Sequence, residues 1–199
     1  MKKIVSKIVV ILLLLCSVAY SGCQKNGTES VVTELCSAKS FTVIEGKTTI
    51  LKYSENKAYW KSKDDFYFFP DDEGKYWAYW RGYNADTWTK QALYLDEYYS
   101  WIHVIKNGIG ISDIGFLDFL NYICLDFDSF TIEKEGKYSL VSDMYEYKYY
   151  EELVFWSKGG SLFFDFGGGI IYTVSSINST KVDFPSSLND AEVGEIWLP

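Results

Sequence analysis

Short runs of β-branched and aromatic residues, separated by turn-forming residues, recur along most of this chain and constrain its fold more than any other feature. At residues 66–81, FYFF is followed by the turn residues PDDEG and then by KYWAYWR. Runs bounded by Gly, Pro, Asn and Asp are typical of β-hairpins. Because the connections are too short for crossover helices, we expect neighbouring strands to be antiparallel.

This pattern predicts a β-dominated α+β fold, a curved antiparallel meander with one main mid-chain helix. We expect strands over residues 41–46, 48–53, 57–62, 66–69, 75–81, 92–95, 98–105, 130–133, 138–141, 153–156, 162–166 and 170–177. The helix is expected over residues 112–122, where Ser112 is a suitable N-cap and Ile114, Leu117 and Leu120 recur at helical spacing.

The N-terminus has the pattern of a secretion signal. Lys2, Lys3 and Lys7 are followed by an apolar run over residues 8–15. A transmembrane helix needs about 20 apolar residues, so this run is too short to span a bilayer. A basic segment followed by a short apolar run is typical of a signal peptide.

The residues that follow, Ala19-Tyr20-Ser21-Gly22-Cys23, resemble the lipobox of bacterial lipoproteins. The resemblance implies that Cys23 is lipidated and becomes the first residue of the mature chain. The domain would then be anchored to the membrane of the cell envelope on its extracytoplasmic side, periplasmic or surface. An ordinary cleaved signal is the alternative. The expected organisation is a signal peptide over 1–22, lipidated Cys23 with a flexible tether over 23–38, a β-rich binding domain over 39–185 and a C-terminal tail over 186–199.

The charge balance argues against nucleic acid or anionic headgroups as partners. The chain has 19 basic and 27 acidic residues, a net charge of −8. Loss of residues 1–22 would remove three lysines and leave 177 residues with a net charge of −11. Nucleic acid and anionic headgroups would be repelled. We therefore expect no nucleic-acid partner, and membrane contact only through the lipid.

Two cysteines remain once Cys16 leaves with the signal and Cys23 is lipidated. Cys36 and Cys124 are 88 residues apart. A disulfide between them suits an extracytoplasmic protein. The alternative is that both are reduced and Cys124 is a core residue.

The order of lipobox, tether, meander, single helix and a final strand in IIYTVSSINSTKVDFP looks like the LolA and LprG/LppX group of lipoproteins. That resemblance implies a half-open antiparallel barrel that holds acyl chains or other hydrophobic ligands in an apolar cavity.

Residues 60–101 hold 15 aromatic side chains in 42 positions. In KYWAYWR, alternation along a strand directs Tyr76 and Trp80 to one face and Trp77 and Tyr79 to the other. Both faces are thus apolar. Either the helix and the tail cover the second face, or the rings line a lipid pocket, or they form a platform for glycan or protein to which Arg81 adds a cation contact. The candidate ligand-binding residues are Trp60, Trp77, Tyr79 and Trp80.

The sequence offers little for catalysis. His103 is the only histidine, and neither a nucleophile elbow nor zinc-ligand spacing is present. We therefore expect that the protein is not an enzyme, and that it has no cofactor and no metal site. The other candidate groups fit turns or solvated positions: Asp71, Asp72, Glu73, Asp126, Asp128 and Gly167 to Gly169. The leading prediction is a non-catalytic module for a lipid or other hydrophobic ligand, and the alternative is a surface module that recognises glycan or protein through exposed aromatics.

Overall fold

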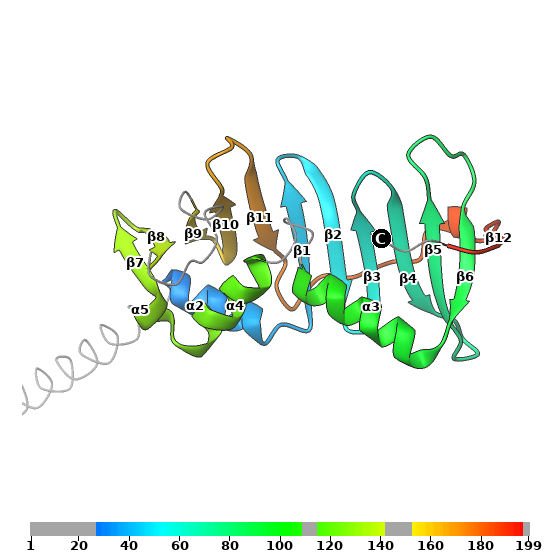
Figure 1. Ribbon diagram of the computed structural model, residues 1–199, viewed down its shortest axis with the longest axis horizontal. Coiled ribbons are helices and arrows are strands. Elements are labelled where there is room, and N and C mark those ends of the chain that lie inside the picture. The colour runs from blue at the N-terminus through cyan, green and yellow to red at the C-terminus, as the bar shows by residue number, and fades with distance from the viewer. Residues whose placement is uncertain (1–26, 109–114, 142–152, 197–199) are drawn as a thin grey trace, which may run out of the picture.

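A computed structural model of the chain describes residues 27–108, 115–141 and 153–196 (Figure 1). Its strands are β1 (Ser40–Glu45), β2 (Thr48–Ser54), β3 (Lys57–Lys61), β4 (Asp65–Pro70), β5 (Tyr76–Arg81), β6 (Thr89–Leu93), β7 (Thr131–Lys134), β8 (Lys137–Leu140), β9 (Val154–Lys158), β10 (Ser161–Asp165), β11 (Ile171–Ser175) and β12 (Glu192–Val193). Its helices are α2 (Thr28–Cys36), α3 (Leu95–Gly108), α4 (Gly115–Leu125), α5 (Phe127–Phe130) and the 3₁₀ helix η3 (Ser186–Leu188).

The strands form one open sheet in the order β12-β6-β5-β4-β3-β2-β1-β11-β10-β9-β8-β7. Neighbours pair antiparallel, except that β12 runs parallel to β6. Figure 1 shows the two ends of the sheet far apart. The predicted β-dominated α+β class and curved antiparallel meander are therefore confirmed. The expected tight turns are also present: Gly159 and Gly160 adopt positive φ angles of 60° and 74°, which a two-residue hairpin turn requires.

Helices α2, α3 and α4 cover one face of the sheet, which we call the helix side (Figure 1). The main core lies between them and the strands. The strand predicted over residues 98–105 is wrong, because this segment belongs to α3. Tyr98, Ile102 and Ile105 recur at helical spacing and are buried, while Asp96 and Glu97 stabilise the first turn. Near the predicted helix over 112–122 the structure has α4, and residues 112–114 lie outside the described residues.

The first described residues also differ from the prediction. A tether is expected over residues 23–38, but Thr28–Cys36 form α2, with Val32 and Leu35 buried in the core. The Thr28 hydroxyl accepts a hydrogen bond of 3.1 Å from the backbone N–H of Ser157 on β9. Residues 28–36 are therefore part of the folded domain. Cys23, the predicted lipidation site, lies outside the described residues.

Residues 178–196, the C-terminal segment, cross the other face of the sheet, which we call the tail side (Figure 1). Val182, Leu188 and Ala191 are buried there against aromatic side chains of β4, β5 and the loop before β6. The backbone N–H of Ile196 donates to Gln91 Oε1 at 2.7 Å. The expected separate tail over 186–199 is therefore part of the folded domain as far as residue 196.

Cys36 and Cys124 form a disulfide in the structure, with their Cα atoms 6.0 Å apart. Cys36 ends α2 and Cys124 lies in the last turn of α4. This bond joins the N-terminal helix to the rest of the helix side.

Candidate functional site

The aromatic side chains of β3, β4 and β5 form rows that cross the strands in register. One row on the helix side consists of Trp60, Phe66 and Trp80. One row on the tail side consists of Tyr59, Tyr67 and Tyr79. Alternation along each strand thus divides one aromatic-rich sequence between two separate surfaces.

The four predicted ligand-binding residues are divided in the same way. Trp60 and Trp80 lie on the helix side, and Trp77 and Tyr79 lie on the tail side. The structure therefore does not bring all four together in one site. Tyr79 is 6% exposed and contacts Phe184 of the C-terminal segment at 5.7 Å between ring centroids, so it is a core residue. The three tryptophans are half-buried.

On the helix side, Trp60 and Trp80 lie beyond the rings that α3 contacts. Tyr98 of α3 packs against Phe68 and Tyr76, which lie one and two rows further along the strands. Trp60 stacks on Phe66 with a centroid distance of 5.2 Å. The Trp80 ring lies close to Gly82, where an added Cβ would be 3.2 Å from its Cζ2 atom. The two indoles therefore flank the buried Phe66 ring.

Two aspartates fix the orientation of two of these indoles. Trp80 Nε1 donates to Asp64 Oδ2 at 3.1 Å, and the other oxygen of Asp64 accepts from the backbone N–H of Tyr83 at 2.9 Å. Trp77 Nε1 donates to Asp71 Oδ2 at 2.9 Å. This hydrogen bond, followed by one from the Lys75 backbone N–H, holds the pKa of Asp71 below its usual value. Indole rings held in this way lose little freedom when a ligand stacks on them.

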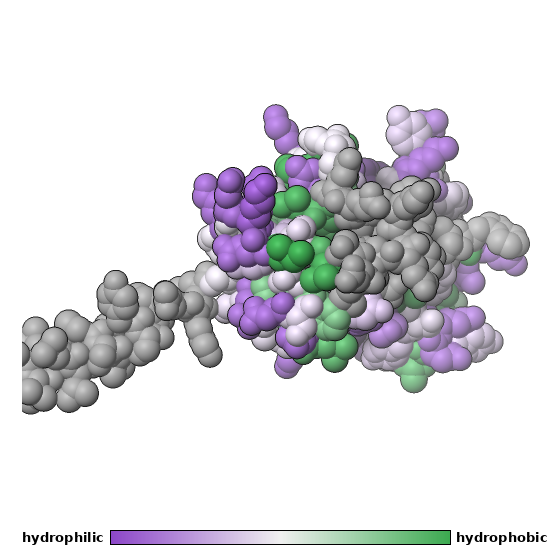
Figure 2. All heavy atoms as spheres, turned by 60° about the vertical axis from the view of Figure 1, so that its left-hand side comes forward, coloured by the Kyte–Doolittle hydropathy of each residue, from purple (hydrophilic) through white to green (hydrophobic). Residues whose placement is uncertain are grey.

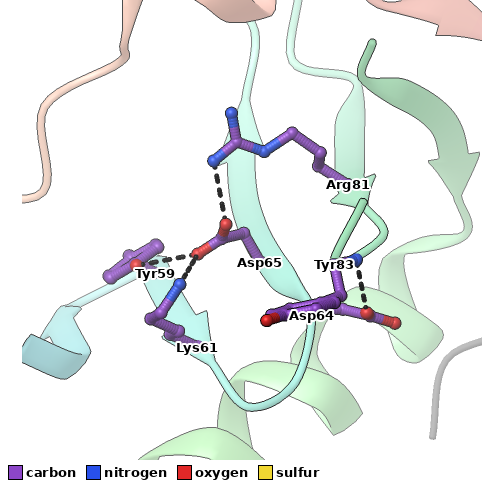
Figure 3. A network of polar contacts seen from close by, with 6 residues as sticks. All are labelled: Tyr59, Lys61, Asp64, Asp65, Arg81 and Tyr83. Carbon is purple, nitrogen blue, oxygen red and sulfur yellow. Dashed lines mark hydrogen bonds and ion pairs between the residues drawn. The ribbon is translucent and has the colours of Figure 1, made fainter. Parts of the chain in front are cut away.

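A polar network on the tail side centres on Asp65 (Figure 3). Its carboxylate accepts hydrogen bonds from Arg81 at 2.9 Å, from Tyr59 at 2.9 Å and from Lys61 at 3.2 Å. Figure 3 shows these three side chains pointing toward Asp65, whereas Asp64 points toward the backbone of Tyr83. The network ties together β3, β4 and β5 at one end of their hairpins.

Burial acts to raise the pKa of the Asp65 carboxyl, but the three hydrogen bonds outweigh burial and leave this pKa below its usual value. The pKa of Tyr59 is raised well above its usual value, first by burial and second by its hydrogen bond to Asp65. Asp65 is therefore ionised and Tyr59 neutral at physiological pH, which makes the network a static clamp rather than a proton donor and acceptor pair.

Arg81 also contacts an aromatic ring of its own chain. Its guanidinium carbon lies 4.7 Å from the centre of the Trp88 ring. Sequence reasoning missed Asp64 and Asp65. The alternation of Lys57, Tyr59 and Lys61 along β3 carries the signal that basic and aromatic side chains share one face.

The remaining predicted groups occupy structural positions. His103 lies exposed on α3 rather than on a strand, within hydrogen-bond distance of Asn107. Asp126 caps α5 by accepting from the backbone N–H of Ser129 at 3.3 Å. In the part of the chain that the structure describes, three or more His, Cys, Asp or Glu side chains do not gather into a metal-binding group. Within the same ranges, every helix is too short or too polar to cross a membrane.

On the face that Figure 2 shows, hydrophobic side chains form patches between hydrophilic ones. No protein-family model matches the chain, and neither a curated protein nor a solved structure matches it.

Proposed function

We propose that this protein is a non-catalytic binding module of a bacterial cell envelope, anchored to the membrane through Cys23, whose β3–β6 region recognises a glycan through its aromatic side chains. The anchor is supported by the lipobox-like sequence before Cys23. The position of the described domain is compatible with it, because three residues separate Cys23 from the first described residue, Gly27.

The glycan proposal rests on the partial exposure and fixed orientation of the Trp77 and Trp80 rings. Both rings are half-buried, and both indole nitrogens are held by aspartates. Sugar rings bind by stacking on aromatic faces and by hydrogen bonds to fixed polar groups. Preorganised, partly exposed rings beside carboxylates offer both kinds of contact.

A lipid ligand stays a prediction. The helix side, where a half-open barrel would hold acyl chains, contains a continuous cluster of the chain's own buried side chains. Native mass spectrometry of the purified protein before and after organic extraction tests this prediction. A species of lipid mass that disappears on extraction would favour the lipid carrier over the glycan module.

The anchor is tested by replacing Cys23 with Ser. Metabolic labelling with radioactive palmitate is expected in the wild-type protein and absent in Cys23→Ser. Equal labelling of both proteins would contradict lipidation at this residue.

The binding surface is tested by substituting one tryptophan on each side of the sheet. Trp77→Ala and Trp80→Ala are compared with Trp156→Ala, a half-buried tryptophan of β9 that stacks on Phe163 outside the proposed region. Binding to a glycan array is expected to fall for at least one of Trp77→Ala and Trp80→Ala, and to persist for Trp156→Ala. Equal binding by all three variants would contradict the proposed surface.

A further inference from the structure

The basic residues of strands β2–β6 all lie on the tail side of the sheet. Their neighbours across the strands and the rings beneath them place them there: Lys52 pairs with Tyr59, Lys57 lies over Phe69, and Lys90 lies over Trp77. The complete set is Lys52, Lys57, Lys61, Arg81 and Lys90. The only acidic residue in these five strands is Asp65, also on the tail side. The helix side of the same strands carries no charge, and the whole chain has a net charge of −8. The strand residues of this face are therefore a local exception in an acidic protein, and the C-terminal segment that crosses the face adds Asp183, Asp190, Glu192 and Glu195 beside Lys181.

The cations of this face lie against aromatic rings. The ammonium nitrogens of Lys57 and Lys90 lie 5.8 Å and 5.5 Å from the ring centres of Phe69 and Trp77. Arg81 lies over Trp88 at 4.7 Å. Cation–π contacts of this kind orient a side chain but leave its charge open to an anion. Rings and positive charges therefore alternate across β2–β6.

Few of these charges are neutralised within the described part of the chain. Asp65 pairs with Lys61 at 3.2 Å and with Arg81 at 2.9 Å, and the side chains of these two partners remain 36% and 39% exposed. The ion pairs of the described residues do not include Lys52, Lys57 or Lys90. The C-terminal segment covers Tyr79 and Trp88 but leaves these three lysines half-buried, so solvent reaches them.

We propose that the tail side of β2–β6 binds an acidic glycan, a saccharide chain that carries carboxylate, sulfate or phosphate groups. This inference rests on the proposed glycan-binding function and specifies its ligand. Sugar rings stack on the half-buried aromatic side chains, and the acidic groups pair with Lys52, Lys57 and Lys90. Charge complementarity between this face and the ligand supplies the selectivity.

The spacing of the cations favours a glycan over nucleic acid. Strands lie about 4.8 Å apart, so the five cations spread over about 19 Å between β2 and β6. Duplex DNA carries one charge per about 1.7 Å of its axis, far denser than this array. The acidic remainder of the chain would repel so dense a polyanion. A polymer with well-separated charges matches the face.

The test uses the full mature chain in detergent and two matched pairs of probes. The first pair is an oligogalacturonide and its methyl ester, and the second is a dextran of low sulfate content and unsulfated dextran of the same length. We expect the acidic member of at least one pair to bind at least about tenfold more tightly than its neutral partner, and this preference to shrink at high salt.

The site is tested with Lys57→Gln/Lys90→Gln against Lys47→Gln/Lys75→Gln. Both variants remove two positive charges, but Lys47 and Lys75 are exposed residues of the β1–β2 and β4–β5 turns. We expect affinity for the acidic probe to fall about tenfold in the first variant and to change little in the second. Circular dichroism and the thermal midpoint of each variant confirm that it is folded.

Two results would overturn the inference while leaving the proposed function intact: equal affinity for acidic and neutral members of both pairs, or equal losses in the two lysine variants. Absence of binding to any acidic or neutral glycan would overturn the glycan-binding function as well. Binding of single-stranded DNA as tightly as the acidic glycan would overturn the assignment to a saccharide.

Discussion

The two halves of the sheet differ in which elements cover their two faces. In the half made by β2–β6, rings point to both sides, and each side has its own cover: α3 on the helix side and the C-terminal segment on the tail side. In the half made by β7–β11, the buried rings of Phe155 and Phe164 face α2 and α4. Its tail side carries the half-buried pair Trp156 and Phe163. The second cover thus goes with the half whose second-face rings, such as Tyr79 and Trp88, are buried.

The comparison also separates two kinds of stabilisation. The Cys36–Cys124 disulfide joins α2 and α4, the helices beside the β7–β11 half. The β2–β6 half instead depends on burial of Leu188 and its neighbours in the C-terminal segment. Substitutions in each half therefore test whether these roles are correctly assigned.

The largest effect is expected from loss of the disulfide. In the chain-entropy model, a loop of 88 residues is worth about 4.6 kcal/mol. Cys36→Ser/Cys124→Ser should therefore lower the free energy of unfolding by about 4–5 kcal/mol in urea titrations. The wild-type protein in reductant should have the same free energy of unfolding as the double variant. A midpoint that neither reductant nor the double substitution shifts would show that the bond does not stabilise this half.

A somewhat smaller effect is expected from the C-terminal cover. Leu188 is 1% exposed, and Leu188→Ala should cost about 3 kcal/mol because it leaves a cavity over the tail-side rings. Val193→Ala is the control, since Val193 is 77% exposed in the same segment. Thermal unfolding monitored by tryptophan fluorescence gives the unfolding midpoints of both variants. Equal midpoints for the two variants would mean that the segment is not an essential cover.

The halves also differ in how well the sequence predicts them. Hairpins are local, and the turn chemistry at Gly74 and at Gly159-Gly160 predicts their strands correctly. The helical state of residues 95–108 is not evident, because WIHVI suits a strand as well as it suits the buried side of α3. The pairing of β1 with β11 and the path of the C-terminal segment depend on contacts between distant residues, which local patterns do not encode.

Part of the candidate site was predictable from the sequence, and part of it was not. Alternation in KYWAYWR predicts the two faces of β5, and the structure has them. The Asp65 network depends on Tyr59, Lys61 and Arg81 meeting across three strands, which requires the register of the hairpins. Composition alone does not reveal that the basic residues of β2–β6 share one side of the sheet, because the net charge carries no information on strand pairing.

A third test removes the charge of Asp65, which is expected to lower stability through contacts of the β2–β6 half alone. Asp65→Asn should cost about 1–2 kcal/mol at neutral pH, because three hydrogen bonds lose their ionised acceptor in a partly solvated site. The folded pKa of Asp65 is below its ordinary value of 3.8, so this contribution is present above that pH and lost below it. The variant and the wild type should therefore converge in acid.

Asp86→Asn is the control for this measurement, since Asp86 is exposed in the loop before β6. Urea titrations at pH 7 and pH 3 give the free energies of unfolding of wild type, Asp65→Asn and Asp86→Asn, six values in all. A difference between Asp65→Asn and wild type that persists unchanged at pH 3 would show that packing, and not the charge, is responsible.

The smallest effect is expected at the seam between the halves, where β1 pairs with β11. The Tyr172 hydroxyl of β11 donates to Glu45 Oε1 of β1 at 2.9 Å. Burial first, and this hydrogen bond second, raise the pKa of Tyr172 to about 12 from its ordinary value of 10.0. Tyr172→Phe should cost about 0.5–1 kcal/mol at pH 7, the net worth of one hydrogen bond.

Because the folded pKa of Tyr172 is the raised one, its contribution is complete below pH 10 and is lost as the pH rises toward 12. The stability advantage of wild type over Tyr172→Phe should therefore shrink between these values. Tyr83→Phe, which alters a side chain on a residue that is 72% exposed, should track wild type throughout. If Tyr172→Phe also tracked wild type at both ends of this range, this hydrogen bond would add nothing to the seam, which would then be held by backbone pairing and by buried side chains such as Val43 and Val174.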